Sequence, residues 1–209
     1  MISIDSIVDK INEIDRYHGS LIRSRVSEFK ALKKSDKYTL FKELSFCILT
    51  ANTSAELGLA CQSYINDGFY KFDYHRLRSE LINVHYRFYN KRSDYIIKAR
   101  SIIDDLPDIV NMDDHYKARE ILIDKVKGIG YKEASHFMRN VGIFDFAILD
   151  KHIINFMKKN YYIKYENNSS KKRYLENEKV FNELSSYFNM EPGIFDLYIW
   201  YIETGKILK

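Results

Sequence analysis

The chain contains very little proline and cysteine. Two prolines and eight glycines among 209 residues leave few positions at which a helix must end, because these two residue types are the strongest helix breakers. The two cysteines, Cys47 and Cys61, form no CxxC pair and no cluster with histidine, so we expect neither a zinc site nor a four-cysteine iron–sulfur cluster. We expect both to be small buried side chains in a reducing cytoplasm.

Long uncharged apolar stretches are also missing. No such run approaches the length of about 18 residues that a membrane-spanning helix needs, and acidic residues stand where a signal peptide would have its apolar run. We therefore expect a cytoplasmic protein that binds no membrane. Apolar residues make up 45% of the chain, enough for a sizeable core, and the net charge is +4. So small an excess is compatible with a polyanionic partner but does not establish one.

Apolar residues recur at helical spacing along most of the chain, whereas strand-like alternation is scarce. This pattern predicts an all-α protein with a single domain over residues 1–209. One helix is expected to end near His18 and Gly19, with a second after it, and a wide apolar surface from Leu40 to Ala51 predicts a central buried helix. The polar segment from Tyr165 to Asn177 is expected to be a solvated loop.

Two closely spaced glycines mark the most informative segment. Residues 118–142 contain two helical patterns separated by a short Gly-x-Gly turn, which predicts a helix-hairpin-helix motif. Gly128 can end the first helix in a left-handed conformation, and Gly130 can open the second. The amide N–H groups that converge at such a helix start suit a phosphate oxygen. An ordinary αα-corner is the alternative, since Gly-x-Gly alone is a weak signal.

A lysine and an aspartate follow the hairpin. Lys132, His136 and Arg139 fall on the face opposite the apolar residues of their helix, so Lys132 is expected to face a cleft or only solvent. A nucleophilic lysine must be neutral, and lowering its usual pKa of ~10.4 to ~7–8 takes about 4 kcal/mol from burial or a nearby cation. Asp150 closes an apolar run before a new helical pattern, which predicts a helix N-cap, a proton acceptor, or both.

These residues closely resemble the archaeal-type, or type 2, 8-oxoguanine DNA glycosylases of the helix-hairpin-helix superfamily. The resemblance rests on Gly128–Phe137 and Ala147–His152, and similarity extends from Leu40 to Lys209. It implies an all-α glycosylase fold with two helical lobes around a cleft. The implied enzyme removes 8-oxoguanine from double-stranded DNA and cleaves the strand 3′ to the abasic site by β-elimination. Lys132 would be the Schiff-base nucleophile and Asp150 its acidic partner, with no redox or organic cofactor.

The same resemblance suggests which residues contact DNA. Asn52 lies in a segment like the one from which the superfamily inserts a polar side chain into the DNA gap. Phe88 and Trp200 are candidates for stacking on the extruded base, with packing in the core as the alternative. The C-terminal carboxylate of Lys209 would accept the N–H that oxidation creates at N7 and would repel the lone pair of normal guanine. The other predicted DNA contacts are Lys127, Gly128, Gly130, Asn90 and Lys91.

Three further points stay open at this level. The outward carbonyls of the hairpin could bind a monovalent cation, as those of the family do. A non-catalytic DNA-binding protein would keep the two glycines but would not need Lys132 or Asp150. A glycosylase of the same superfamily could also act on another damaged base. We expect a monomer.

Overall fold

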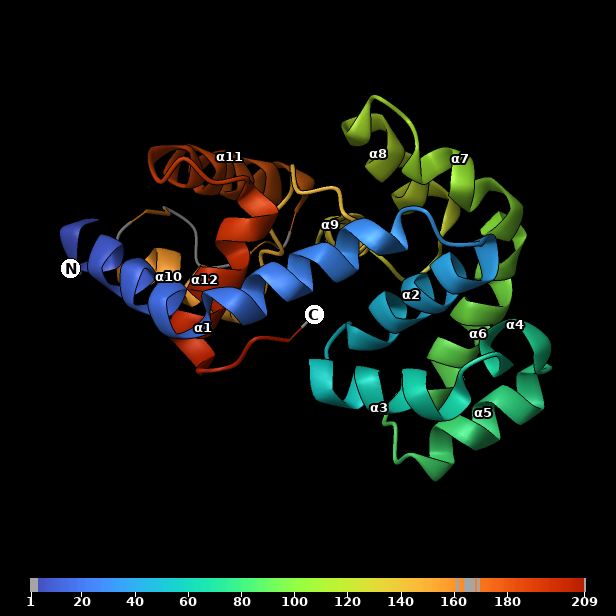
Figure 1. The fold of residues 1–209 in the computed structure, drawn as a ribbon. Coiled ribbons are helices and arrows are strands. Elements are labelled where there is room, and N and C mark those ends of the chain that lie inside the picture. Colours follow the sequence, from blue (N-terminus) through green and yellow to red (C-terminus); the bar gives the residue numbers. More distant parts are fainter. Residues whose placement is uncertain (1–3, 161, 164–167, 169, 209) are drawn as a thin grey trace. The chain divides into compact units, whose positions relative to one another are not determined.

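The computed structural model describes residues 4–160, 162–163, 168 and 170–208, and every regular element in these ranges is a helix (Figure 1). The all-α prediction is thereby confirmed. Contacts divide the chain into two compact units: unit 1 contains residues 1–30 and 142–209, and unit 2 contains residues 31–141. None of the described helices is long and apolar enough to cross a membrane.

The helices of unit 1 are α1 (Ile4–Leu32, whose last two residues belong to unit 2), α10 (Lys151–Lys159), α11 (Lys171–Tyr187) and α12 (Pro192–Thr204). Those of unit 2 are α2 (Lys37–Thr50), α3 (Ala55–Ile65), α4 (Gly68–Lys71), α5 (Tyr74–Asn83), α6 (Tyr89–Ala99), the 3₁₀ helix η1 (Arg100–Asp105), α7 (Leu106–Val110), α8 (His115–Lys125) and α9 (Tyr131–Asn140).

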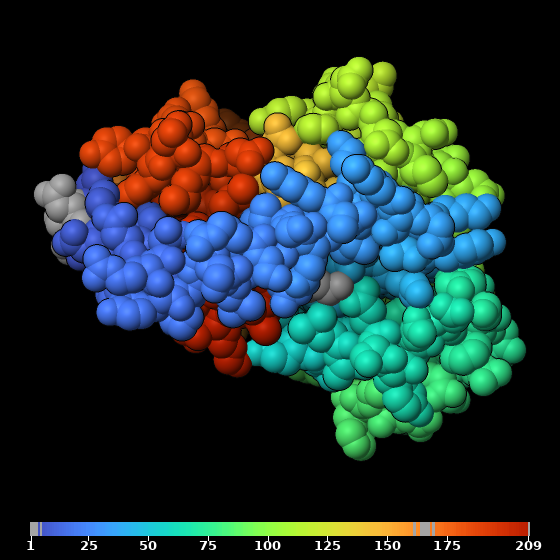
Figure 2. Space-filling view, viewed as in Figure 1, coloured from blue at the N-terminus to red at the C-terminus, as the bar shows by residue number. Residues whose placement is uncertain are grey.

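Helix α1 runs through Gly19 without a break, so the prediction of two separate helices was wrong. Ile14 and Ile22, about 2.2 turns apart, are 5% and 1% exposed, so one buried stripe continues across the glycine. A glycine inside a helix costs only about 1 kcal/mol relative to alanine, and this continuous packing offsets it. Arg23 and Asp15 form an exposed ion pair of 3.0 Å that spans Gly19. Figure 2 shows the surface of the N-terminal part of the chain in blue.

Helix α2 is the buried helix of unit 2 that the sequence predicts. It begins after Asp36, whose carboxylate accepts the backbone N–H groups of Tyr38 and Thr39. From Leu40 onward nearly every residue is buried, because α3, α4, α6 and α9 all pack against this helix. Its end at Thr50 places the following turn at the surface of the unit.

From Ala134 to Asn140 helix α9 is buried on all sides, which differs from the polar face that the sequence predicts. His136 and Arg139 are only 6% and 3% exposed. The ring of His136 meets Phe46 of α2 edge-on, with the ring centroids 5.4 Å apart. The Arg139 side chain donates to Asn140 Oδ1 at 3.2 Å. Because α2 and α8 both pack against α9, its polar residues from Ser135 to Asn140 are removed from solvent.

Helix α11 begins inside the segment expected to be a loop. Ser170 caps it by accepting the backbone N–H of Arg173 at 3.3 Å, and Tyr174 and Asn177 are buried. The loop prediction is therefore wrong for residues 171–177, while residues 164–167 and 169 lie outside the described ranges. Of residues 171–177 only Tyr174 and Asn177 are buried, so this part of the sequence shows little helical periodicity.

An extended segment, residues 143–149, leads to Asp150 and is held by helices of unit 1. The backbone N–H of Gly193 donates to the Phe144 carbonyl at 2.8 Å. The backbone N–H of Ile148 donates to Asp196 Oδ1, a carboxylate that is 1% exposed, at 3.3 Å. Because buried backbone groups need partners, these contacts keep an irregular segment in the core and set where Asp150 emerges.

Cys47 and Cys61 are both fully buried, as predicted. Burial raises the pKa of the Cys61 thiol to about 11. A thiol with so high a pKa is a packing group rather than a nucleophile.

Candidate active site

The hairpin between α8 and α9 is held by buried apolar side chains and by a glycine with a positive φ. Val126 and Ile129 are 1% and 9% exposed, so they anchor the turn in the core of unit 2. Gly128 has φ +95°, which confirms the predicted left-handed conformation. A Cβ atom at this position would lie 2.1 Å from Cδ2 of Tyr95. Glycine is therefore required here by backbone conformation and by close packing.

Gly130 serves a different purpose. It precedes α9 as the N-cap, as predicted, with φ −122° and ψ −163°, a conformation open to any residue. A Cβ atom here would meet only Oε2 of Glu133, at 3.8 Å. The fold does not require glycine at this position, so its small size instead leaves room for a group outside the protein. The N-terminus of a helix presents N–H groups and a partial positive charge to such a group.

Lys132 lies in the first turn of α9 and is held by its neighbour Glu133. Its Nζ atom lies 3.1 Å from Glu133 Oε1, with 29% of the lysine side chain exposed. The other carboxylate oxygen of Glu133 accepts the backbone N–H of Gly130 at 3.2 Å. Glu133 thus joins the hairpin to the candidate nucleophile, a role that we did not predict. A glutamate at the third position of a helix, where capping boxes have one, was the available signal.

Asp150 is the N-cap of α10, as predicted. Its Oδ1 atom accepts the backbone N–H groups of His152 at 2.8 Å and Ile153 at 3.0 Å. Its Oδ2 atom accepts the indole N–H of Trp200 at 3.3 Å. The carboxylate is therefore fixed in orientation by three donors from two helices.

Trp200 lies near the C-terminal end of α12 and is partly exposed. Its ring meets His152 edge-on, with the centroids 6.0 Å apart. Full burial in the core is excluded, and stacking on an extruded base stays a prediction. The structure adds a direct link between Trp200 and Asp150, which sequence spacing did not reveal because the two residues are 50 positions apart.

Phe88, Asn90 and Lys91 gather where α6 begins. Phe88 precedes the helix and is partly exposed, and the guanidinium carbon of Arg87 lies 5.1 Å from its ring centroid. Asn90 and Lys91 are both exposed. The side-chain oxygen of Asn90 accepts a hydrogen bond from Nε of Arg78.

Asn52 is exposed in the turn between α2 and α3 and has φ +62°. Asparagine tolerates this left-handed conformation better than most residues do. The turn is closed by the backbone N–H of Thr53, which donates to the Thr50 carbonyl at 3.2 Å. Ser54 then caps α3. A rigid turn therefore presents the Asn52 side chain at the surface of unit 2.

Two predicted contact residues remain to be placed. Lys127 is exposed on the hairpin, with Nζ 5.7 Å from the ring centroid of Tyr95. Lys209 lies outside the described residues. Among the hairpin carbonyls, that of Gly128 accepts a hydrogen bond from Nη1 of Arg92 at 3.2 Å, and cation binding by the hairpin stays a prediction.

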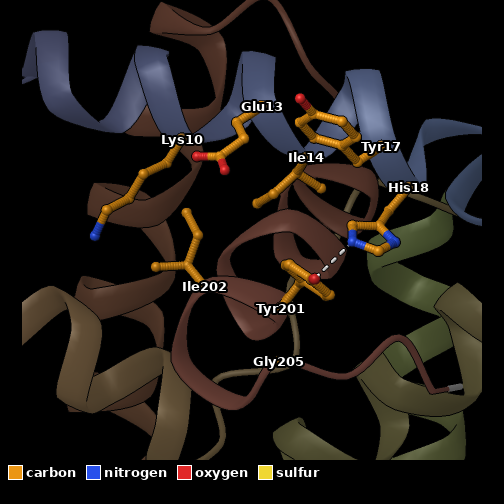
Figure 3. Close-up of a pocket in the computed structure, with 8 residues that line it drawn as sticks. All are labelled: Lys10, Glu13, Ile14, Tyr17, His18, Tyr201, Ile202 and Gly205. Carbon is orange, nitrogen blue, oxygen red and sulfur yellow. Dashed lines mark hydrogen bonds between the residues drawn. The ribbon is translucent and has the colours of Figure 1, made fainter.

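A pocket of about 340 Å³ in unit 1 contains none of the predicted site residues. It lies between α1 and the end of α12, where the Tyr201 hydroxyl and His18 Nε2 form a hydrogen bond of 2.8 Å (Figure 3). Gly205 ends α12 with φ +69° at the edge of this pocket. This hydrogen bond joins α1 to the last turn of α12, after which the C-terminal segment begins.

The site residues thus form two groups. In unit 2, α9 holds Lys132 and Glu133, while in unit 1 Asp150 and Trp200 are in contact. The pairing of Lys132 with Asp150 stays a prediction. Within the described part of the chain, no group of three or more His, Cys, Asp or Glu side chains is arranged to hold a metal ion.

Solved structures establish the class of protein. The crystal structure of the 8-oxoguanine DNA glycosylase of Thermotoga maritima is 39% identical, covers 99% of this chain and all of that one, and superposes with a TM-score of 0.94. The 8-oxoguanine glycosylase/lyase of Methanocaldococcus jannaschii, solved with a 15mer DNA containing 8-oxoguanine, is 41% identical. That comparison covers 97% of this chain and 99% of the other, with a TM-score of 0.92. The fold is that of the helix-hairpin-helix DNA glycosylases.

Sequence comparison narrows the class to a family. The family described as 8-oxoguanine DNA glycosylase matches residues 22–190. A relative from Picrophilus torridus, named 8-oxoguanine DNA glycosylase/AP lyase, is 81% identical over 209 residues, which is the full length of both chains. The chain belongs to the 8-oxoguanine DNA glycosylase family.

Proposed function

We propose that Lys132 and Asp150 carry out the two reactions of this chain. As a member of its family, the chain is a base-excision repair enzyme that removes 8-oxoguanine from DNA and cleaves the strand at the abasic site. The observation that carries the residue assignment is the position of Lys132, in the first turn of a helix that begins at a hairpin suited to phosphate. A phosphate held there would bring the DNA backbone beside the lysine.

In the first reaction the neutral Nζ atom of Lys132 attacks C1′ of the damaged nucleotide. The bond from Nζ of Lys132 to C1′ forms as the bond from C1′ to the base breaks, and the base leaves with one proton of the amine. The C1′–O4′ bond then breaks and O4′ takes the second proton of the amine, which gives a Schiff base. In the second reaction, removal of a C2′ proton breaks the bond from C3′ to the 3′ phosphate, which leaves. The ion pair between Lys132 and Glu133 must open, and the lysine ammonium must lose a proton, before the amine can attack.

Asp150 acts in the same reaction as a negative charge of fixed orientation. A carboxylate stabilises the positive charge that develops on the sugar and can accept a proton during the reaction. The backbone N–H groups of α10 and the indole of Trp200 hold this carboxylate before substrate arrives. Such preorganisation matters because no reorientation is then needed at the moment of reaction.

The partner is DNA containing 8-oxoguanine. Asn52, Phe88, Lys91 and Lys127 are exposed or partly exposed in unit 2, which supports their assignment as DNA contacts. Lys209 is proposed as the reader of the damaged base. A substrate in genomic DNA supports a cytoplasmic, nucleoid-associated location, and we further propose a single-domain monomer.

Borohydride trapping tests the catalytic assignment. Lys132→Gln should give no trapped adduct on duplex containing 8-oxoguanine, with DNA affinity within about threefold of wild type. Lys125→Gln is the matched control: it makes the same charge change at the other side of the hairpin, where Lys125 forms an exposed 2.8 Å ion pair with Asp105. An undiminished adduct in Lys132→Gln would remove this lysine from the mechanism.

Asp150→Asn tests the acidic partner. The replacement keeps an oxygen for the helix cap and for the indole but loses the charge. Loss of general acid–base assistance should slow single-turnover cleavage by about 10²- to 10⁴-fold. Cleavage at the wild-type rate would show that Asp150 only caps α10. Running wild type on duplexes with other damaged bases tests whether 8-oxoguanine is the preferred substrate.

A further inference from the structure

Arg92 connects two surface segments that are distant in the sequence. It belongs to α6 and is 8% exposed. Its Nη2 atom donates to the carbonyl of Ala51 at 3.0 Å, and its Nη1 atom donates to the carbonyl of Gly128 at 3.2 Å. Ala51 immediately precedes the turn that presents Asn52, and Gly128 is part of the hairpin. All of these residues lie in unit 2.

A second contact from the same helix strengthens the joint at the hairpin. Tyr95, three residues after Arg92, packs so closely on Gly128 that no Cβ atom would fit between them. The guanidinium carbon of Arg92 lies 5.5 Å from the centroid of the Tyr95 ring. The hairpin is therefore held on α6 by a hydrogen bond and by an aromatic face.

Arginine suits this position for geometric reasons. Its planar guanidinium offers donors in a rigid fork, so it can reach two carbonyls in different directions at once. Lysine would keep the positive charge but offers no such fork. Because Arg92 is buried and its Nη atoms are used by backbone carbonyls, its geometry is that of a structural brace rather than of a phosphate ligand.

We propose that Arg92 is a positioning residue that fixes the Asn52 turn and the hairpin in one relative arrangement, so that both engage the same DNA duplex. This inference rests on the proposed function, in which both segments contact DNA. Holding two contact segments in place before binding removes an ordering cost from association. Loss of the brace should therefore weaken DNA binding, although no direct contact with DNA is lost.

The test compares Arg92 with Arg100, a matched control in the same unit. Arg100 also donates to backbone carbonyls, those of Phe69 at 2.9 and 2.7 Å and of Phe72, but these lie at α4. Arg92→Gln and Arg92→Lys should each weaken binding to duplex with a stable abasic-site analogue by about 10- to 30-fold, where tenfold corresponds to about 1.4 kcal/mol. Arg100→Gln should stay within about threefold. Binding is measured well below each variant's unfolding temperature.

The salt dependence of binding separates a brace from a phosphate contact. Each phosphate contact adds about 0.9 to the slope of log Kd against log salt concentration. Arg92→Gln should leave this slope unchanged, whereas Lys127→Gln should lower it by about 0.9. A slope lowered by about 1 in Arg92→Gln would make Arg92 a phosphate ligand and overturn the proposal.

Two other results would also overturn it. One is wild-type affinity in the Arg92 variants, and the other is an equal loss in Arg100→Gln, which would indicate general destabilisation. If Arg92→Gln does not fold, the affinity of Arg92→Lys alone tests the proposal, because the brace requires donors that point to two carbonyls and not only a positive charge. Failure of the wild-type protein to bind damaged duplex would instead count against the proposed function.

Discussion

The two glycines of the hairpin should respond to substitution in opposite ways. Gly128→Ala should destabilise the protein, because it forces an L-residue to φ +95° and places a methyl group against Tyr95. A left-handed conformation costs roughly 1–2 kcal/mol, and overpacking a well-filled site costs roughly 1–3 kcal/mol more. A total of about 3 kcal/mol would lower the Tm by roughly 6–12 °C in a chain of this size.

Gly130→Val should leave stability nearly unchanged. Its backbone conformation suits any residue, and the position of a Cβ atom is open apart from Glu133 Oε2 at 3.8 Å. Valine is a poorer N-cap than glycine, which lowers the free energy of unfolding by up to about 1 kcal/mol. Because valine also restricts the unfolded chain, it raises the same free energy by about 0.4–1 kcal/mol. The added side chain would instead push a bound phosphate away from the N-terminus of α9. One lost hydrogen bond to a charged group corresponds to about 1.5–3 kcal/mol, or roughly 10- to 150-fold in Kd.

Calorimetry and fluorescence anisotropy together test this contrast. Calorimetry gives the Tm of both variants, and anisotropy gives the Kd for a duplex with 8-oxoguanine and for the same duplex undamaged. Gly130→Val should weaken both complexes alike, because phosphate contacts position a protein without reading the base. Gly128→Ala should be measured for binding only where calorimetry shows it to be folded.

Wild-type affinity of Gly130→Val for both duplexes would refute phosphate binding at the hairpin. A loss confined to the damaged duplex would show instead that the hairpin serves the base pocket. If Gly130→Val lowered the Tm as much as Gly128→Ala, the reasoning from the two Cβ positions would itself be wrong.

Two further predictions concern recognition and chemistry. Trp200→Phe keeps an aromatic face but loses the N–H donated to Asp150. We expect the rate of cleavage at a preformed abasic site and the rate of base excision each to fall about tenfold. Unchanged cleavage at the abasic site would mean that the indole N–H does not contribute to catalysis. Deleting Lys209 should reduce excision of 8-oxoguanine by roughly 10- to 150-fold relative to abasic-site cleavage; equal losses in both single-turnover assays would assign the terminal residue to folding or general DNA binding.

Local features of the site were predictable from the sequence. The left-handed Gly128, the N-cap role of Asp150 and the buried helix α2 were all predicted correctly. Each depends on a few neighbouring residues whose backbone preferences are strong. Stacking by Phe88 and Trp200 and base reading by Lys209 came from the family resemblance and stay predictions.

Features that depend on tertiary packing were not predictable in this way. Gly19 breaks no helix because a buried stripe continues past it, and His136 is buried because two helices cover α9. The contacts of Arg92 join positions 41 and 36 residues away in the chain, so no local pattern indicates them. Periodicity reports one buried face of a helix, and it fails where a second face is covered as well.

Because Trp200 is hydrogen-bonded to Asp150, its intrinsic fluorescence can report on the active site. Trp200 is the single tryptophan among 209 residues, and its indole N–H touches the carboxylate proposed to act on the sugar. Indole emission depends on the polarity and charge around the ring. Excitation at wavelengths where the 17 tyrosines absorb little would therefore follow events at Asp150 in real time, in unlabelled protein and with unmodified DNA.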